Sequence, residues 1–307
     1  MKRSMTIAAV AAGATLFSIL ASGPAEAAPR PDAQKWAVLV GVSEYQPPTV
    51  PTAGSANDAR DMRTVLLRNG WREDHIRVLV DGDATAAEIR SALDWLVAKS
   101  TPDSFSVFHY SGHTKQAQSG FDDGDAEEWD EFLWSVDNQF ISDGEFAGWM
   151  RRLQGNAWIN ISNCEAAGFD DGVSAPNRLF TAASQEDEKG YERYDTKRSI
   201  YTGLLTDAFL NGRGDSDRDK TVSIQEAFAY AAENAPRQSA NGEHGPQTPY
   251  SAGGDGSQWR LGPAAFTKQT QGTSLVPPGL LPPELLRLIP PGLLPPGILP
   301  PIAPQTP

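Results

Sequence analysis

Cysteine is nearly absent from this chain of 307 residues, which contains Cys164 and no other. A single thiol cannot form a disulfide within the chain, so it is an intermolecular link, an inert buried thiol or a nucleophile. Positive charge is also scarce, because 26 Lys and Arg stand against 39 Asp and Glu, for a net charge of −13. Such an acidic protein is poorly suited to nucleic acid or anionic lipid, and we expect neither as a partner.

Long hydrophobic runs are lacking too, apart from Ile7–Leu20 near the start of the sequence. That run follows Lys2 and Arg3 and precedes the small-residue site Ala25-Glu26-Ala27, a pattern typical of a secretory signal peptide over residues 1–28. No later run is long enough to predict a transmembrane helix. We therefore expect a secreted, extracellular protein whose mature chain has no membrane span.

Apolar, strand-like runs alternate with amphipathic, helix-like stretches and predict one α/β domain over residues 33–262. Strands are expected over Trp36–Val42, His75–Val80, Ser104–Tyr110, Glu131–Val136, Ala157–Ser162 and Arg178–Ser184. Helices are expected over Ser55–Asn69, from Asp83 or Thr85 to Lys99, from Ser142 or Asp143 to Leu153, over Ser199–Asn211 and over Ile224–Glu233. These elements predict a mostly parallel β-sheet of about six strands, flanked by helices on both faces.

Proline dominates the last part of the chain, where Pro-Pro pairs recur between Pro277 and Pro301, separated by short leucine-rich spacers. Proline at this density prevents helix and central strand and favours extended polyproline II. We expect residues 267–307 to form a Pro/Leu-rich disordered tail. This tail is either a flexible extension or an apolar tether to the cell wall or to a protein partner.

Two of the predicted strands are followed by chemically reactive side chains. His113 comes after the strand Ser104–Tyr110, and Cys164 comes after the strand that ends at Ser162. Because ligands bind at the carboxyl ends of parallel strands, we expect His113 and Cys164 to form a base and a nucleophile at one edge of the sheet. His109 lies inside its strand and is expected to be a strand residue and not a second base.

In its order and spacing, with His113 placed 51 residues before Cys164, the chain resembles the caspase–metacaspase cysteine peptidases of the C14 type, specifically their bacterial members. The resemblance covers most of Trp36–Tyr230 and rests on the segments WAVLVGVSEY, SANDARDM, FHYSGHT, GDAEEWDEFLW, ISDGEF and ISNCEAAG. It implies a caspase-like fold and an endopeptidase that acts on proteins or peptides with no cofactor for the chemistry. Cys164 would attack the peptide carbonyl, and His113 would protonate the leaving amine.

The same resemblance assigns the groups that surround the reaction. The oxyanion would be stabilised by the backbone N–H groups of Cys164 and of Thr114, which stands where the family usually has Gly. Two Asp residues line the family's pocket for Arg or Lys: one corresponds to Asp58 and is retained, and the other corresponds to Ser162. A preference for a basic residue before the cleaved bond is therefore expected, but one carboxylate fewer weakens the case for strict specificity. The alternative is that Asn57 or Asp58 caps the start of the helix over Ser55–Asn69.

Calcium is the cation that the acidic loop after Gly214 would bind. Asp215, Asp217, Asp219 and Glu226 occupy positions 1, 3, 5 and 12 of an EF-hand-like loop, and Thr221 offers its carbonyl at position 7. Position 6, where Gly is usual, holds a lysine. The alternative is an acidic turn that caps the next helix.

A second calcium site is implied by the resemblance alone. Metacaspases use an activating calcium cluster, and its positions fall near Asp143 and Asp171 in this chain. Gly144 stands where a further Asp would be expected.

Two other hypotheses remain open for the function. The altered residues around Cys164 and at Thr114 favour a caspase-like binding module whose catalysis has decayed, whereas the retention of Cys164 and His113 opposes it. A gingipain-like, Arg/Lys-specific secreted cysteine peptidase is the third hypothesis, because it shares the order of His before Cys. Reaction with a thiol probe distinguishes the first two, since an activated thiolate is alkylated rapidly at neutral pH.

Overall fold

The computed structural model describes residues 34–118 and 129–262. The predicted signal peptide (1–28) and the predicted tail (267–307) lie outside the described residues. Among the described residues, no helix is both long and apolar enough to cross a membrane.

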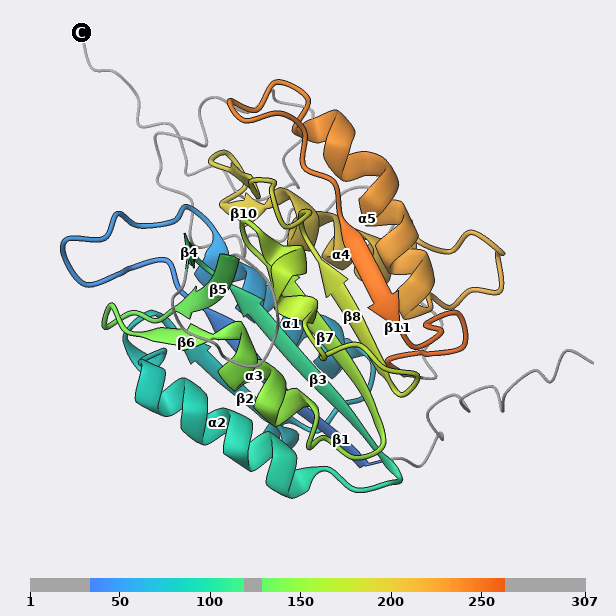
Figure 1. Cartoon of the computed structure of the whole chain (residues 1–307). Coiled ribbons are helices and arrows are strands. Elements are labelled where there is room, and N and C mark those ends of the chain that lie inside the picture. Colours follow the sequence, from blue (N-terminus) through green and yellow to red (C-terminus); the bar gives the residue numbers. More distant parts are fainter. Residues whose placement is uncertain (1–33, 119–128, 263–307) are drawn as a thin grey trace, which may run out of the picture.

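The centre of the domain is a six-stranded sheet with the strand order β11-β8-β7-β3-β1-β2 (Figure 1). Its strands are β1 (Gln34–Gly41), β2 (Ile76–Val80), β3 (Ser104–Ser111), β7 (Asn156–Ser162), β8 (Arg178–Ala182) and β11 (Tyr250–Gly253). All neighbours pair in parallel except β11, which runs antiparallel to β8 at the edge. The predicted mostly parallel sheet is therefore confirmed.

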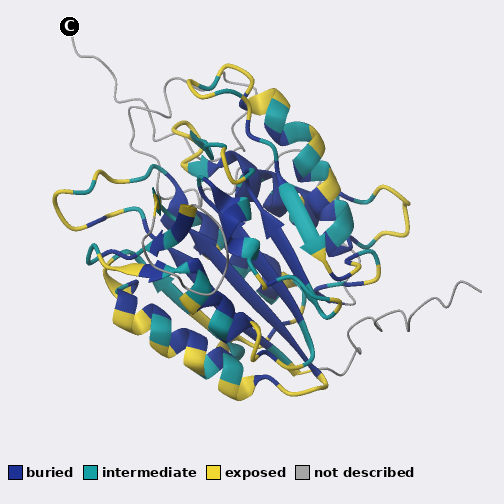
Figure 2. Ribbon diagram, viewed as in Figure 1, coloured by how far each residue is buried: buried dark blue, intermediate teal, exposed yellow. Residues whose placement is uncertain are grey.

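The helices form a layer on each face of this sheet (Figure 1). The near layer of that view holds α2 (Ala86–Lys99) and α3 (Asp143–Met150). The far layer holds α1 (Ser55–Arg68), α4 (Ile200–Asn211) and α5 (Ile224–Gln238), with α4 packed on both α1 and α5. Short 3₁₀ turns cover Glu73–His75, Asp81–Asp83 and Ala166–Asp170. Figure 2 shows the sheet buried between the two layers.

Hydroxyl side chains start several helices, as capping rules predict. Thr85, not Asp83, caps α2 by accepting a hydrogen bond from the Glu88 N–H at 3.2 Å. Helix α5 begins with a capping box between Ser223 and Glu226. It continues past the predicted end at residue 233 to Gln238, with Pro236 in its last turn. Proline has no N–H, so residue 236 donates no hydrogen bond within the helix.

A second, three-stranded sheet lies beside the carboxyl end of β3. It consists of β4 (Thr114–Gln118), β5 (Trp129–Trp134) and β6 (Phe140–Ser142), paired antiparallel. The strand predicted over 131–136 belongs to this small sheet and not to the central one. The sixth central strand is β11, which the sequence did not predict. A hairpin of two very short strands, β9 (Glu192–Arg193) and β10 (Arg198–Ser199), completes the fold.

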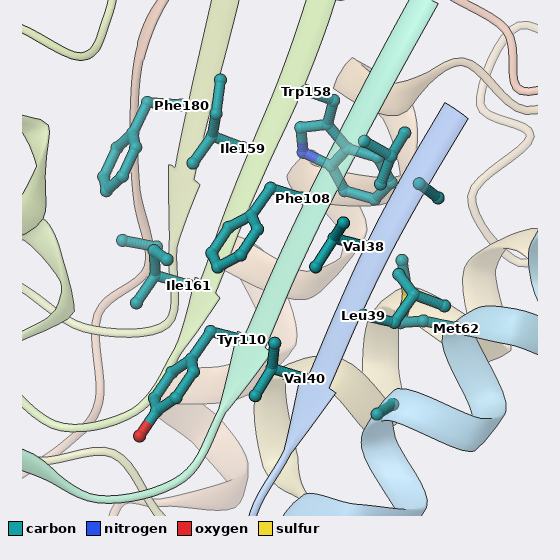
Figure 3. Close-up of a cluster of buried hydrophobic side chains, with 14 of the residues drawn as sticks. Val38, Leu39, Val40, Met62, Phe108, Tyr110, Trp158, Ile159, Ile161 and Phe180 are labelled. Atoms are coloured by element: carbon teal, nitrogen blue, oxygen red, sulfur yellow. The ribbon is translucent and has the colours of Figure 1, made fainter. Parts of the chain in front are cut away.

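The register of the central sheet aligns large side chains into rows that cross several strands. Val38, Phe108, Ile159 and Phe180 occupy paired positions on β1, β3, β7 and β8, and all four are buried (Figure 3). Each such side chain contributes about 1.5–3 kcal/mol through removal of apolar surface from water. This row fixes the register of β3 against β7, and hence the relative height at which the two strands end.

Candidate active site

The carboxyl ends of β3 and β7 bring His113 and Cys164 to one cavity. The strands pair with Ser111 opposite Ser162, so His113 and Cys164 each lie two residues beyond this last pair. Both residues line a cavity of about 120 Å³ at this edge of the sheet. The nucleophile and base predicted from the sequence therefore share one site.

The imidazole ring of His113 is held by two contacts. Its Nε2 lies 2.9 Å from the Val50 carbonyl oxygen, and its ring centroid lies 4.9 Å from that of Tyr45. A carbonyl oxygen can only accept a hydrogen bond, so Nε2 carries the proton of that bond. The second ring nitrogen, Nδ1, is then the one that can take a proton from a nucleophile.

Two tyrosines fix the turn that carries His113. The Tyr45 hydroxyl accepts a hydrogen bond from the His113 N–H at 2.6 Å, and the Tyr110 hydroxyl donates to the His113 carbonyl at 2.8 Å. Both hydroxyls pass close to Gly112, where an added Cβ would lie 2.7 Å from each of them. Gly112 is therefore required by this close approach, which explains the glycine in the Ser-Gly-His sequence.

The Cys164 thiol is half-buried and points toward the Gly190 carbonyl, with Sγ 3.8 Å from the oxygen. Burial raises the pKa of this thiol above its ordinary value, and the negative charge of Glu165 raises it further. The resting site therefore holds a protonated thiol, which must lose its proton when a substrate is attacked.

A segment comprising residues 185–199, named here the covering segment, lies against this thiol. Its Gly190 packs so closely that an added Cβ would lie 2.5 Å from the Asn163 carbonyl oxygen. The Glu165 N–H donates to the Glu188 carbonyl at 2.8 Å, and the Glu165 carboxylate forms an ion pair with Lys189. The covering segment is thus anchored directly beside Cys164.

Thr114 faces the nucleophile from the start of β4. Its hydroxyl donates a hydrogen bond to the Cys164 carbonyl at 2.8 Å. Because the Trp134 N–H donates to the His113 carbonyl at 3.3 Å, Thr114 and Leu133 form a non-hydrogen-bonded pair. The Thr114 N–H therefore points away from β5 and does not take part in that ladder.

The two predicted pocket residues, Asp58 and Ser162, occupy different positions. Ser162 lines the cavity, and its Oγ lies 3.0 Å from that of Ser199. Asp58 lies behind this surface with no exposed area, and it accepts hydrogen bonds from the Ser111 hydroxyl at 2.8 Å and the Ser199 N–H at 3.1 Å. Burial raises the pKa of Asp58 to about 7 despite these bonds.

His109 is the strand residue that the sequence indicated. It is fully buried, and its Nδ1 lies 2.8 Å from Asn160 Nδ2 on the neighbouring strand. Burial lowers its pKa to about 3. His109 lies on the face of the sheet where Asn160 meets Tyr201 of α4, so it is not placed to act as a second base.

Asp143 and Asp171, implied by resemblance as cation ligands, come together with a third carboxylate, Glu131. One oxygen from each residue lies within 4.8 Å of the others, and Glu131 and Asp143 are buried. The Asp143 carboxylate also accepts a hydrogen bond from the Glu131 N–H at 2.9 Å. Sequence reasoning missed Glu131, although it lies in the acidic segment that contributes to the resemblance. Three clustered carboxylates fit a hard cation such as Ca²⁺.

Three predicted ligands of the acidic loop after Gly214 come together. Carboxylate oxygens of Asp215, Asp217 and Asp219 lie within 4.8 Å of one another. Asp219 also forms an ion pair with Arg260 at 3.3 Å. Glu226 takes part in the capping box of α5, and its carboxylate also accepts a hydrogen bond from the Ser216 N–H of the loop at 3.1 Å. The Thr221 N–H donates to Asp219 at 2.7 Å, and the ligand role of the Thr221 carbonyl stays a prediction.

The lysine at position 6 of this loop adopts the backbone conformation expected of glycine. Lys220 has φ +71°, in the left-handed region. The left-handed conformation at position 6 therefore forms without glycine.

Comparison with known proteins assigns the family. The caspase-domain model of peptidase family C14 matches residues 34–251, and the chain belongs to this family of cysteine peptidases. Metacaspase-8 of Arabidopsis thaliana is 29% identical over 144 residues, which are 44% of this chain and 38% of that protein. Metacaspase-3 of the same plant is 33% identical over 121 residues, covering 37% of this chain and 33% of the relative. The chain thus spans about a third of the length of these relatives.

A solved structure supports the fold. The crystal structure of protein GSU0716 from Geobacter sulfurreducens superimposes with a TM-score of 0.55 at 16% identity, over 76% of this chain and all of the other. At this identity the likeness concerns the fold alone.

Proposed function

We propose that the chain is a secreted cysteine-type endopeptidase in which Cys164 is the nucleophile and His113 the acid and base. The observation that carries this proposal is that both residues follow neighbouring parallel strands and line the same cavity. Family membership adds support, since caspase-domain proteins are cysteine peptidases. Proteins or peptides are the substrates.

In the proposed reaction, Nδ1 of His113 takes the thiol proton as the Cys164 sulfur attacks the carbonyl carbon of the cleaved bond. The tetrahedral intermediate collapses, the C–N bond breaks, and His113 gives its proton to the leaving amine. Water then loses a proton to His113 and attacks the thioester. The acid product leaves, and the thiol is restored.

Stabilisation of the oxyanion is assigned to the backbone N–H groups of Cys164 and Thr114. The orientation of the Thr114 N–H away from β5 supports this assignment. A threonine at this position also supplies the hydroxyl that bonds to the Cys164 carbonyl. Removal of one such N–H donor typically lowers kcat by 10²–10³.

A basic residue before the cleaved bond is the proposed preference. The buried Asp58 carboxylate lies directly behind the hydroxyl of Ser111, which lines the cavity. A positively charged substrate side chain in the cavity would favour the ionised form of Asp58.

Calcium is the proposed activator, held by Glu131, Asp143 and Asp171. A route to the active site runs through Gln116, whose Nε2 donates to the Glu131 carboxylate at 2.8 Å and lies 3.4 Å from the Glu186 carbonyl of the covering segment. A cation that recruits the Glu131 carboxylate would weaken its bond to Gln116 and loosen that contact. The ion plays no part in the bond-breaking steps.

A decayed binding module is the second candidate function. The raised pKa of Cys164 and the tight packing of Gly190 against its loop favour it, because both keep the thiol unreactive.

Turnover of a fluorogenic peptide library tests the proposal. The protein comprising residues 29–307 is assayed with and without calcium, beside the Cys164→Ala variant. Cleavage that Cys164→Ala abolishes establishes the peptidase. Absence of cleavage under every condition, together with a thiol that iodoacetamide does not alkylate, would favour the binding module.

A further inference from the structure

The cavity of the candidate active site contains a carboxylate. Among the described residues that line the cavity of His113 and Cys164, Glu192 of β9 is the only one with a carboxylate. The other polar groups of that surface include four serine hydroxyls, those of Ser55, Ser111, Ser162 and Ser199. Ser162 brings no negative charge to the cavity. Glu192, from a different part of the chain, supplies one.

The Glu192 carboxylate is held in place by uncharged donors. It accepts hydrogen bonds from the Ala53 N–H at 2.6 Å, the Gly54 N–H at 2.9 Å and the Ser55 hydroxyl at 3.1 Å. These groups precede or begin α1, where the helix favours negative charge. The same donors are thereby occupied, so they are not offered to an acidic ligand.

The neighbouring cations do not neutralise this carboxylate. In the covering segment Lys189 pairs with Glu165, Arg193 with Asp195, and Arg198 with Asp61. Among the described residues no ion pair involves Glu192. A carboxylate that is fixed by neutral donors and faces a cavity retains its attraction for a cationic ligand.

Asp58, once ionised, adds to the negative potential of the same cavity. The negative charge of Glu192 is one cause of the raised pKa of Asp58, after burial, so the two carboxylates are close enough to interact. Asp58 is covered by Ser111 and Ser199, whereas Glu192 is in direct contact with the cavity. A cation entering the cavity would meet Glu192 first and Asp58 through the serine hydroxyls.

We propose that Glu192 determines specificity by binding the guanidinium or ammonium group of the substrate residue that precedes the cleaved bond. This inference rests on the proposed function and deepens it, because it assigns the basic preference to a residue outside the two positions expected from the family. Glu192 replaces the carboxylate that Ser162 lacks. Because Glu192 belongs to the covering segment, this segment forms part of the pocket wall.

The test compares two peptides that differ only in charge at the residue before the cut, one with arginine and one with its neutral isostere citrulline. Assays contain calcium, and kcat/KM is measured for wild type, Glu192→Gln and Glu192→Asp. We expect Glu192→Gln to lower kcat/KM for the arginine peptide by about thirtyfold and to leave the citrulline peptide unchanged. Glu192→Asp, which keeps the charge, should retain part of the discrimination. Asp187→Asn is the matched control, since it removes the charge of an exposed side chain of the same segment.

A binding measurement tests the role of Glu192 independently of peptide cleavage. Dissociation constants of the two labelled peptides are measured on the Cys164→Ala protein and on Cys164→Ala combined with Glu192→Gln. Preference for arginine that disappears with Glu192→Gln supports the inference, even if wild type cleaves neither peptide and the proposed peptidase activity is wrong. Retention of the full preference in Glu192→Gln, or no preference in the parent protein, overturns the inference, while cleavage of either peptide would still support a peptidase. Circular dichroism and thermal unfolding of each variant show whether a loss reflects misfolding.

Discussion

The hydroxyl of Thr114 donates a hydrogen bond to the carbonyl oxygen of Cys164 at 2.8 Å, and so joins the segment after His113 to the nucleophile. The two residues are 50 positions apart in the sequence and follow different strands. The bond restrains the peptide unit that follows Cys164. A glycine at residue 114 could not make it, so the threonine side chain adds a contact.

Replacement of Thr114 by valine tests this contact, because valine keeps the shape and removes the hydroxyl. We expect kcat to fall about fivefold with little change in KM, as for the loss of a hydrogen bond worth ~1 kcal/mol. Thr114→Ser retains the hydroxyl and should remain close to wild type. Equal kcat values for wild type and Thr114→Val would show that the bond does not position the nucleophile.

Glu165 should control how readily Cys164 ionises. The Glu165 charge raises the pKa of the thiol, while Lys189 lowers it. Glu165→Gln removes the first effect, so the pKa should fall and alkylation by iodoacetamide at pH 7 should become several-fold faster. Lys189→Met should have the opposite effect. The measurement is the pH profile of the alkylation rate, and an unchanged midpoint in both variants would contradict the prediction.

Asp58 should make the protein less stable as the pH rises. Its folded-state pKa of about 7 lies above the ordinary value of 3.8, so the folded protein holds a proton that the unfolded chain has lost. The stabilising effect of that proton is present at low pH and is lost as the pH rises through about 7. Between pH 5 and pH 8 this group should lower the free energy of unfolding by about 2–3 kcal/mol.

Urea unfolding of wild type and Asp58→Asn at both pH values measures this effect. Asparagine has no charge to lose, so the decrease between pH 5 and pH 8 should be smaller in the variant. The same decrease in both proteins would assign the pH dependence to other groups.

The cluster of Glu131, Asp143 and Asp171 should account for the effect of calcium. Glu131→Gln is expected to abolish the calcium-induced rise in melting temperature and any calcium requirement for turnover. Gly168→Ala should do the same, because its Cβ would overlap the Glu131 carboxylate. The matched control is Asp219→Asn in the loop after Gly214. Loss of the calcium effect in Asp219→Asn alone would place the ion in that loop.

The elements with strong local patterns could be predicted from the sequence. Strands β1, β3, β7 and β8 are apolar runs buried on both faces, and α1, α2 and α4 carry regular apolar stripes. The edge strand β11 could not be predicted, because Tyr250–Gly253 has no strand pattern and is a strand only through its pairing with β8. Strand β4, with the sequence TKQAQ, was missed for the same reason.

The residues of the candidate site also divide into those that could be predicted from the sequence and those that could not. His113 and Cys164 are visible in the sequence because each directly follows a buried strand. Glu192 is not, since its partners Ala53 and Gly54 lie almost 140 positions away and two of the three donors are backbone groups. The Val50 carbonyl that orients His113 has no side-chain signal at all. These contacts exist only after the chain has folded.

The covering segment joins two properties that could have been encoded separately. Its Gly190 carbonyl contacts the Cys164 thiol, and its Glu192 contributes to the wall of the pocket. Substitutions within the covering segment could therefore change both the access of substrate to the thiol and the selectivity of the pocket, while the sheet and the catalytic residues stay the same. A protein engineer seeking an altered cleavage preference would replace the covering segment alone and keep the rest of the domain.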